Sequence, residues 1–442
     1  MIKNENQLLK LLGVGFGVAV TVGGTIGTGI LRKPGIISGL IGDPLTIMML
    51  WLAVGIYAVL GTLCAIELAV SIPQAGAWYV YARRAFGNYF GFVTGITSWL
   101  GTVSALGFGA YTLSEYITLL MPATAQYIGL MAVCLLLLLT GFHWLGTRSA
   151  GRSQEVLAVL KAVGLLLFVV VCFLFGGNPT GSDLTDTIQK QSTTLTFIAV
   201  ISALQAIFYT YDGWHTATYF SEENTNPAKT LPKSMLYGVV MVIIIYMLVN
   251  GAILYALPHD TLSQSKLAAA DTISYIFGDQ YARVITILLM VSILGIVNAQ
   301  IMFAPRVIYS MSRDGLFLKA GTQVNKAGTP SVAMPLTSLF SIMLILSGKD
   351  TCSRLSDIAT FFFVLSYAAG FGALIRLRYS EPELPRPFKA PLFPLLPSLL
   401  IVLSLMFLAG AVYSDIKSSL YALVFLVLSY PLFILVVRLN KD

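Results

Sequence analysis

Apolar segments long enough to cross a membrane recur along the whole chain and are separated by short polar connections. A bilayer core needs about 20 apolar residues in a helix, so the pattern predicts an all-α polytopic membrane protein. We count twelve transmembrane helices, which leave no room for a separate soluble domain. Their approximate positions are 14–31, 45–70, 89–120, 125–141, 154–176, 195–220, 233–257, 274–303, 331–347, 356–379, 395–414 and 417–438.

Composition agrees with this pattern. Of 442 residues, 57% are hydrophobic and 11% charged, and the mean hydropathy is +0.82. A chain of this kind belongs among membrane lipids, so we expect no nucleic-acid partner despite the formal net charge of +7. The polar N-terminus is followed by no short apolar stretch with a cleavage site, so the first segment should stay in the mature protein. The four cysteines lack disulfide or metal-ligand spacing, and we expect no cofactor and no metal.

The distribution of Lys and Arg predicts the orientation. With the N-terminus inside, 18 of the 27 basic residues fall on that side and 8 on the other. Arg306 counts among the 18, in the connection after the eighth segment. By the positive-inside rule both termini are cytoplasmic, in a multi-pass protein of the cell membrane. One basic residue, Lys161, remains within a segment.

A glycine-rich run interrupts the first segment. Four of the seven residues at 23–29 are glycine, which makes this stretch easy to unwind. Unwound backbone at membrane depth is tolerated only where it is buried in protein or lines a cavity, so the run indicates a binding site. The alternative is close helix packing, since Gly13 with Gly17 and Gly23 with Gly27 have the four-residue spacing of helix contacts.

A second interruption lies five segments later. Asp212 and Gly213 break an otherwise apolar run near the middle of segment six. Breaks in helices 1 and 6 are the pattern expected when two five-helix halves form an inverted repeat with the substrate at their interface. The halves would be residues 14–176 and 195–379, followed by two additional helices at 395–438.

Two such breaks predict a specific chemistry. Where the first segment resumes, the amides of Gly27, Thr28 and Gly29 lie at a helix N-terminus and suit a carboxylate. Where the two segments stop, carbonyls near Val22, Gly23, Phe208 and Tyr209 lose their partners and suit an ammonium group. The pair describes a zwitterionic α-amino acid.

The residues resemble those of the amino acid, polyamine and organocation (APC) transporters. Residues 23–30 are similar to that family's glycine-rich first helix, and 72–81 to the loop between its second and third helices. Residues 211–214, 226–232 and 246–250 are similar to the L-type amino acid transporter branch. The resemblance covers about 14 to 390 and implies the LeuT-type 5+5 inverted repeat with broken helices 1 and 6.

The resemblance also implies roles for individual residues. The substrate carboxylate would be held by Thr25, Ile26, Gly27, Thr28 and Gly29. The backbone around Phe208, Tyr209 and Asp212 would meet the amino group, and Trp214 and Tyr246 would be gate or pocket side chains. Asp212 stands where the family often has a small residue, and it either pairs with the substrate ammonium or caps the broken helix. The short connection at 121–124 lacks the cysteine that animal relatives use to join a heavy chain, so no disulfide-linked partner is expected.

Lys161 allows three interpretations. It lies about 10 Å into its span, so its side chain can snorkel to the surface. It can instead hold a fixed ammonium where sodium-coupled relatives bind a cation; in the resembling branch such a lysine is thought to replace the sodium. A lysine with a lowered pKa can also carry a coupling proton.

Function follows from these features. We predict a secondary transporter working by alternating access, a sodium-independent exchanger of neutral L-amino acids, because no buried charge is obviously placed to select a charged side chain. A proton-coupled permease for cationic amino acids or polyamines is the alternative if Asp212 faces the distal part of the pocket. A channel would need a continuous polar lining, and an enzyme would need a nucleophile, a metal cluster or paired acids. The sequence indicates none of these.

Overall fold

The computed structural model describes residues 8–10, 12–177, 196–347, 349–414 and 416–440. This part of the chain is built from helices, with isolated β-bridges such as the one joining Leu12 to Asn224 but no strand. The predicted second repeat begins at 195, which lies outside the described residues. The helices are α1 (Val14–Thr25), α2 (Thr28–Leu40), α3 (Pro44–Ser71), α4 (Trp78–Phe86), α5 (Asn88–Leu120), η1 (Pro122–Tyr127), α6 (Ile128–Trp144), α7 (Thr147–Phe175), α9 (Phe197–Tyr211), η2 (Thr216–Glu223), α10 (Pro227–Ala256), α11 (His259–Gln264), α12 (Ala268–Phe277), α13 (Asp279–Arg313), η3 (Lys319–Thr322), α14 (Ala333–Leu346), α15 (Lys349–Ser380), α16 (Leu395–Ser414) and α17 (Ile416–Leu439).

The polytopic all-α class is confirmed. Within the described residues, ten helical stretches are long and apolar enough to cross a membrane, with α1 and α2 together forming the first. Two of the twelve predicted segments correspond to shorter helices, the 15-residue α9 and the 14-residue α14. At 1.5 Å per residue neither alone spans a bilayer core of about 30 Å, so the count of twelve stays a prediction.

Two predicted segments end well before their helices do, because charged residues continue the helices. The first segment was expected to end at 31, yet α2 runs to Leu40 and contains Arg32, which forms an ion pair with Glu115 of α5. The eighth was expected to end at 303, yet α13 runs to Arg313. Arg306 therefore lies inside a helix, 2% exposed, and its Nη2 donates to Glu223 Oε2 at 2.8 Å. Paired charges can enter a helix that a hydropathy window would end.

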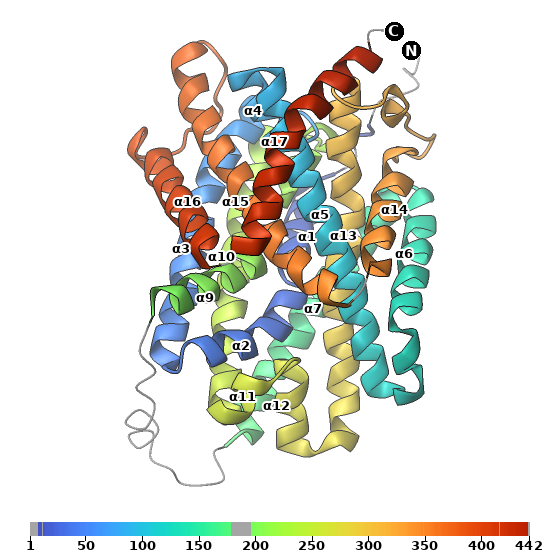
Figure 1. Cartoon of the computed structure of the whole chain (residues 1–442), viewed down its shortest axis with the longest axis vertical. Helices are drawn as coiled ribbons and strands as arrows, with labels where there is room; N and C mark the ends of the chain where they lie inside the picture. The colour runs from blue at the N-terminus through green and yellow to red at the C-terminus, as the bar shows by residue number, and fades with distance from the viewer. Residues whose placement is uncertain (1–7, 11, 178–195, 348, 415, 441–442) are drawn as a thin grey trace.

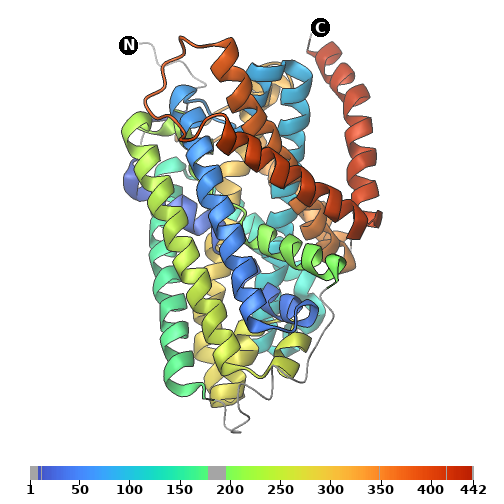
Figure 2. The same cartoon turned by 90° about the vertical axis from the view of Figure 1, so that its left-hand side faces the viewer.

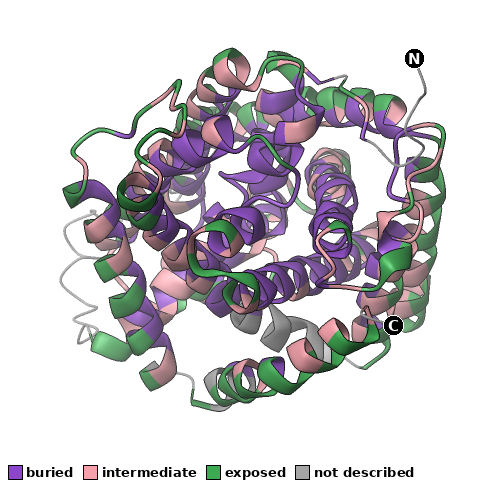
Figure 3. Ribbon diagram, turned by 90° about the horizontal axis from the view of Figure 1, so that it is seen from above, coloured by how far each residue is buried: buried purple, intermediate pink, exposed green. Residues whose placement is uncertain are grey.

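The first broken segment lies at the centre of the bundle. In its most apolar window 83% of the residues of Val14–Leu40 are buried, against 11% for Pro122–Trp144 and for Ala422–Leu439. Figure 3, a view along the bundle, shows buried residues gathered in the middle and exposed ones around the outside. The exposed side chains of the outer helices are apolar, for example Leu138 (74%) on α6 and Val427 (74%) on α17. Such an outer surface suits lipid, while the inner helices form the core.

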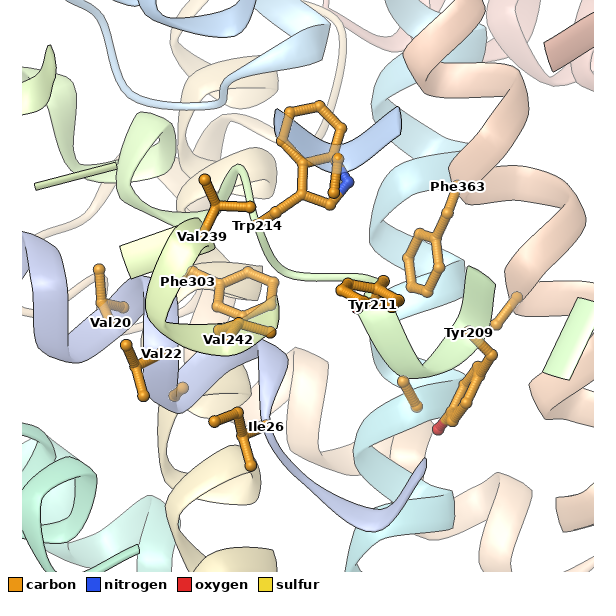
Figure 4. Packing of buried hydrophobic residues seen from close by; sticks show 14 of the residues in the cluster. Val20, Val22, Ile26, Tyr209, Tyr211, Trp214, Val239, Val242, Phe303 and Phe363 are labelled. Carbon is orange, nitrogen blue, oxygen red and sulfur yellow. The ribbon is translucent and has the colours of Figure 1, made fainter. Parts of the chain in front are cut away.

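The first described residues and the last turns of α17 lie at the same end of the molecule (Figures 1 and 2). The short helices α11 and α12 lie at the opposite end (Figure 1). The bridge between Leu12 and Asn224 joins the segment before α1 to the segment before α10. The breaks after α1 and after α9 lie between these two ends (Figure 1), and Figure 4 shows them from close by.

Candidate functional site

The first helix is interrupted inside the glycine-rich run. Helix α1 ends at Thr25, Ile26 is extended (φ −74°, ψ 115°), and α2 begins at Thr28 after Gly27. No side chain caps the start of α2. The predicted carboxylate-binding amides of Gly27, Thr28 and Gly29 thus stand at an uncapped helix N-terminus, where partial positive charge collects.

The glycines also permit close packing, so the alternative interpretation describes part of the same run. A Cβ added to Gly23 would lie 1.8 Å from the Gln154 amide nitrogen, and one added to Gly29 would lie 2.5 Å from Thr210 Oγ1. At Gly27 the added atom would lie 2.5 Å from Ile296 of α13. Unwinding and close approach therefore occur in one segment, and neither excludes the other.

Lys161 of α7 lies directly against the first break. Its side chain is fully buried, and its amino group donates to the carbonyl oxygens of Gly23, at 2.9 Å, and Ile26. Gly295 of α13 makes room for it, since a Cβ there would lie 2.9 Å from Lys161 Cε. The snorkelling interpretation is wrong: the amino group points into the bundle because unpaired carbonyls at the break offer it partners.

The second interruption follows α9. The helix ends at Tyr211, Asp212 takes an extended conformation (φ −55°, ψ 140°), and Gly213 has φ 110°. A positive φ of this size favours glycine. A Cβ on Gly213 would lie only 2.2 Å from the carbonyl oxygen of Gly24. The two breaks are therefore in contact, and Gly213 is required both by its backbone angle and by its neighbour.

Tyr246 of α10 joins the two breaks. Its hydroxyl lies 2.8 Å from the carbonyl oxygen of Thr25 and 2.7 Å from that of Thr210, so the single proton can serve either acceptor. The ring is fully buried between Trp51 and Tyr211, at centroid distances of 5.5 and 4.9 Å. Tyr246 thus holds together the last turns of the two half-helices.

The expected set of free carbonyls needs correction. Val22 O accepts from the amide of Ile26 at 2.9 Å, and Phe208 O accepts from that of Asp212 at 3.0 Å. Tyr209 O is also within 3.4 Å of the Asp212 amide. One more amide closes each final turn after the helical residues end, so the carbonyls that leave the helix lie further along the chain. At the first break they belong to Gly23, Thr25 and Ile26, and at the second to Thr210.

Asp212 has a partner on a distant helix. Its carboxylate accepts a hydrogen bond from the hydroxyl of Tyr367, on α15. Unlike the fully buried residues around it, Asp212 keeps intermediate exposure. Tyr367 was missed in the sequence, because one tyrosine in an apolar helix carries no local signal of a partner 155 residues away.

Trp214 is packed into an aromatic cluster next to Asp212. Its ring centroid lies 5.9 Å from that of Trp78, 5.1 Å from His215 and 5.1 Å from Tyr367. Figure 4 shows Trp214 and Tyr211 on the segment around the second break, with the Trp214 ring pointing away from Ile26, which marks the first. The Trp214 ring therefore packs on the aromatic side of the second break, whereas Tyr211 packs against Trp51 and Tyr246.

The other predicted site residues lie nearby and are buried. Thr25, Ile26 and Thr28 are at most 2% exposed, and the hydroxyl of Thr25 donates to Thr21 O at 2.7 Å, so Thr25 offers the break only its backbone. Tyr209 is 8% exposed and packs edge-to-face on Phe108 at 5.7 Å. Phe208 instead packs on Phe407 at 4.5 Å, toward the α16 side. The structure brings all of them together except the Phe208 side chain, whose ring turns away.

A helical membrane protein with two interrupted helices meeting in its core has the architecture of a membrane transporter. A family model for amino acid permeases matches residues 16–430. The chain therefore belongs to the amino acid permease family, within the APC superfamily whose resemblance the motifs indicated. It is a transporter and not an enzyme.

Curated relatives agree. The chain is 28% identical to the serine/threonine exchanger SteT of Bacillus subtilis over 429 residues, covering 95% of this chain and 94% of SteT. It is 26% identical to the mouse b(0,+)-type amino acid transporter 1, covering 92% of this chain and 84% of the relative. The human large neutral amino acids transporter small subunit 2 is 26% identical, with coverage of 88% and 74%. All three relatives are named as amino acid transporters or exchangers, and the similarity covers most of each chain.

Proposed function

We propose that this protein is a sodium-independent exchanger of neutral L-amino acids that works by alternating access. The observation that carries the proposal is the amino group of Lys161, bonded to two carbonyls of the first break. Carbonyls at a broken helix are the groups that coordinate a sodium ion in ion-coupled carriers. A protonated Lys161 supplies a fixed positive charge to the same groups, so no sodium ion is needed there.

The substrate's common part is recognised by the two breaks. Its carboxylate binds the backbone of residues 25–29, chiefly the uncapped amides of Gly27, Thr28 and Gly29. Its ammonium group meets the backbone near Phe208 and Tyr209 and the carboxylate of Asp212. Trp214 lies beside the substrate as a wall of the pocket. Tyr246 acts differently from a pocket side chain: it keeps the two half-helices in register, which the carboxylate site requires.

Neutral side chains are favoured by the surroundings of the breaks. Apart from Lys161, the charged group at the breaks is Asp212, which already accepts a hydrogen bond from Tyr367. The aromatic rings of Tyr209, Tyr211 and Trp214 are uncharged, and relatives named for serine, threonine and large neutral amino acids fit such a pocket. The alternative, a proton-coupled permease for cationic amino acids or polyamines, draws support from Asp212 alone.

We further propose the full membrane topology. Twelve helices cross the cell membrane with both termini in the cytoplasm, which matches the shared end of the N-terminal residues and α17 (Figure 1). Residues 14–176 and 195–379 form the inverted LeuT-type repeats, with broken helices 1 and 6, and 395–438 adds two helices. The loop at 121–124 holds no cysteine, so the protein works without a disulfide-linked heavy chain.

Transport in proteoliposomes tests these statements together. Labelled uptake is measured for a panel of neutral, cationic and anionic amino acids and a polyamine, with internal substrate, pH and sodium varied independently. We expect saturable uptake of neutral amino acids that requires internal amino acid and does not change when choline replaces sodium. Uptake of a cationic substrate driven by a pH gradient without internal substrate would establish the alternative. Flux that does not saturate would indicate a channel.

A further inference from the structure

A basic cleft lies away from the substrate site, at the end of the molecule that carries the chain termini. It has two adjoining parts of about 430 and 380 Å³, and both are lined by Arg148 and Arg152 of α7. The larger part also meets Phe16 and Glu155, and the smaller part meets Leu9 and Ala327. The cleft therefore runs between the N-terminal segment and the turn from α6 to α7.

The two arginines are available to a ligand. Both are exposed, and neither has an ion pair or side-chain hydrogen bond within the described part of the chain. Spaced four residues apart, they project from the same face of α7. Other arginines of the chain do have partners: Arg84 forms an ion pair with Glu381, and Arg313 forms one with Glu222. The positive charge of the cleft is thus not used by the protein itself.

The cleft opens beside the lipid-facing surface. Trp144 (44% exposed), Leu145 (70%) and Val156 (59%) flank the start of α7. Tryptophan at the end of a spanning helix is typical of the membrane interface, at the level of the lipid headgroups. The arginines therefore stand where phosphate groups of the bilayer lie, with apolar side chains below them to contact acyl chains.

We propose that this cleft binds the headgroup of an anionic phospholipid. The phosphate is assigned to the 380 Å³ part, which Arg148, Arg152 and Ser149 line and which no acidic residue touches among the residues that the structure describes. Glu155 lines only the other part, toward Phe16, and disfavours an anion there. Two guanidinium groups bind a phosphate with charge-assisted hydrogen bonds, and basic pockets between helices at this level suit such lipids.

The bound lipid acts on the transport machinery through its position. Leu9 precedes α1 and Phe16 lies in its first turn, and the arginines belong to α7, which carries Lys161. A headgroup in the cleft contacts both and resists their separation. The lipid therefore stabilises the arrangement in which Lys161 reaches the first break. This inference concerns a site distinct from the substrate site and does not depend on which amino acid is transported.

Quenching of tryptophan fluorescence tests the proposal in nanodiscs. Of the five tryptophans, the other four are at most 3% exposed, so Trp144 is the one that acyl chains can reach. We compare phosphatidylglycerol with brominated chains, diluted in phosphatidylcholine, against the same mole fraction of brominated phosphatidylcholine. The wild type should show a several-fold higher apparent affinity for the anionic lipid, and Trp144→Phe should remove most of the quenching.

Charge variants decide the outcome. The double variant Arg148→Gln/Arg152→Gln should lose the preference for phosphatidylglycerol, while Arg148→Lys/Arg152→Lys should keep most of it and shows that the fold survives change at these positions. Arg376→Gln/Arg438→Gln removes the same charge from exposed positions on α15 and α17 and should behave as wild type. Equal quenching by the two lipids in the wild type, or an unchanged preference in the glutamine double variant, would overturn the proposal. So would inorganic phosphate raising the melting midpoint in pure phosphatidylcholine discs in an arginine-dependent way, because the ligand would then be a soluble anion.

Discussion

The two breaks at the centre of the bundle are held in opposite ways. At the first, backbone carbonyls of Gly23 and Ile26 receive an amino group, that of Lys161. At the second, the polar side chain is a carboxylate, Asp212, and its partner is a neutral hydroxyl from Tyr367. A positive group thus stands behind the break proposed to bind the substrate carboxylate, and a negative group stands at the break proposed to bind its ammonium group.

This difference teaches how one site can hold a zwitterion without sodium. The amino group of Lys161 donates its hydrogen bonds to carbonyls of the first break, and that backbone lies between the amino group and the proposed substrate position. Asp212 is less completely buried than its neighbours, and we propose that its carboxylate meets the substrate ammonium. Tyr246 is common to both breaks and fixes their separation. We therefore propose that Lys161 builds the site, that Asp212 contacts the ligand and that Tyr246 keeps the two halves in register.

The largest expected effect comes from Lys161→Met. The change leaves the Gly23 and Ile26 carbonyls without their donor in the core, at a cost of about 1–3 kcal/mol for each buried unpaired group. We expect exchange in proteoliposomes to fall by about 100-fold or more. Lys266→Met, on an exposed lysine, is the control and should change nothing. A Lys161→Met protein that exchanges amino acids at the wild-type rate would show that the first break does not need the amino group.

Gly27→Ala should reduce substrate binding by about tenfold, the range in which overpacked sites fall. The added Cβ meets the side chain of Ile296, which must shift together with the amides that follow Gly27. Scintillation-proximity binding of a labelled neutral amino acid measures the loss. A second change, Ile296→Ala, relieves the contact and should restore most of the affinity. If affinity is unaffected by Gly27→Ala alone, the amides after the break are not the carboxylate site.

Tyr246→Phe removes the hydroxyl that lies between Thr25 O and Thr210 O. One buried hydrogen bond is lost and the carbonyls stay unpaired, which costs about 1–3 kcal/mol. We expect a lower melting midpoint and a substrate affinity reduced by about tenfold, since the two breaks lose their register. Tyr237→Phe alters an exposed tyrosine (65%) of the same helix and serves as the control. Loss of stability with full affinity would limit Tyr246 to a structural role.

The smallest effect is expected from Tyr367→Phe, because Asp212 keeps its charge and its access to the substrate. The carboxylate loses one partner, so its position becomes less defined, and affinity should change by a few-fold only. Asp212→Asn should reduce affinity more than Tyr367→Phe does. Tyr379→Phe on the exposed part of α15 is the matched control. Comparable affinity in Asp212→Asn and the wild type would exclude the carboxylate from the ammonium site.

Much of the architecture is readable from apolar runs, because a membrane demands them. The ten long apolar stretches of the described residues follow from run length, and the position of the first break follows from glycine. The ends of α2 and α13 do not, since Arg32 and Arg306 stay in their helices through partners on other helices. A hydropathy pattern treats each segment separately and cannot predict pairs between segments.

The site divides in the same way. Residues 23–29 and Asp212 with Gly213 signal their own breaks, because glycine and a buried acid are unusual in apolar helices. Lys161 could be singled out, but its three interpretations differ only in where the side chain points. Tyr246 could be named only from the family resemblance, as a pocket side chain, and Tyr367 was missed, because their contacts lie 221 and 155 residues away along the chain.

Binding of a labelled neutral amino acid to the purified wild-type protein in sodium, potassium or choline chloride tests the central claim most directly. We propose that the fixed positive charge of Lys161 at the first break makes an added cation unnecessary. We therefore predict the same saturable affinity in all three salts, with Lys161→Met binding weakly in each. A strict requirement for sodium in the wild type would contradict the claim that Lys161 takes the place of the ion.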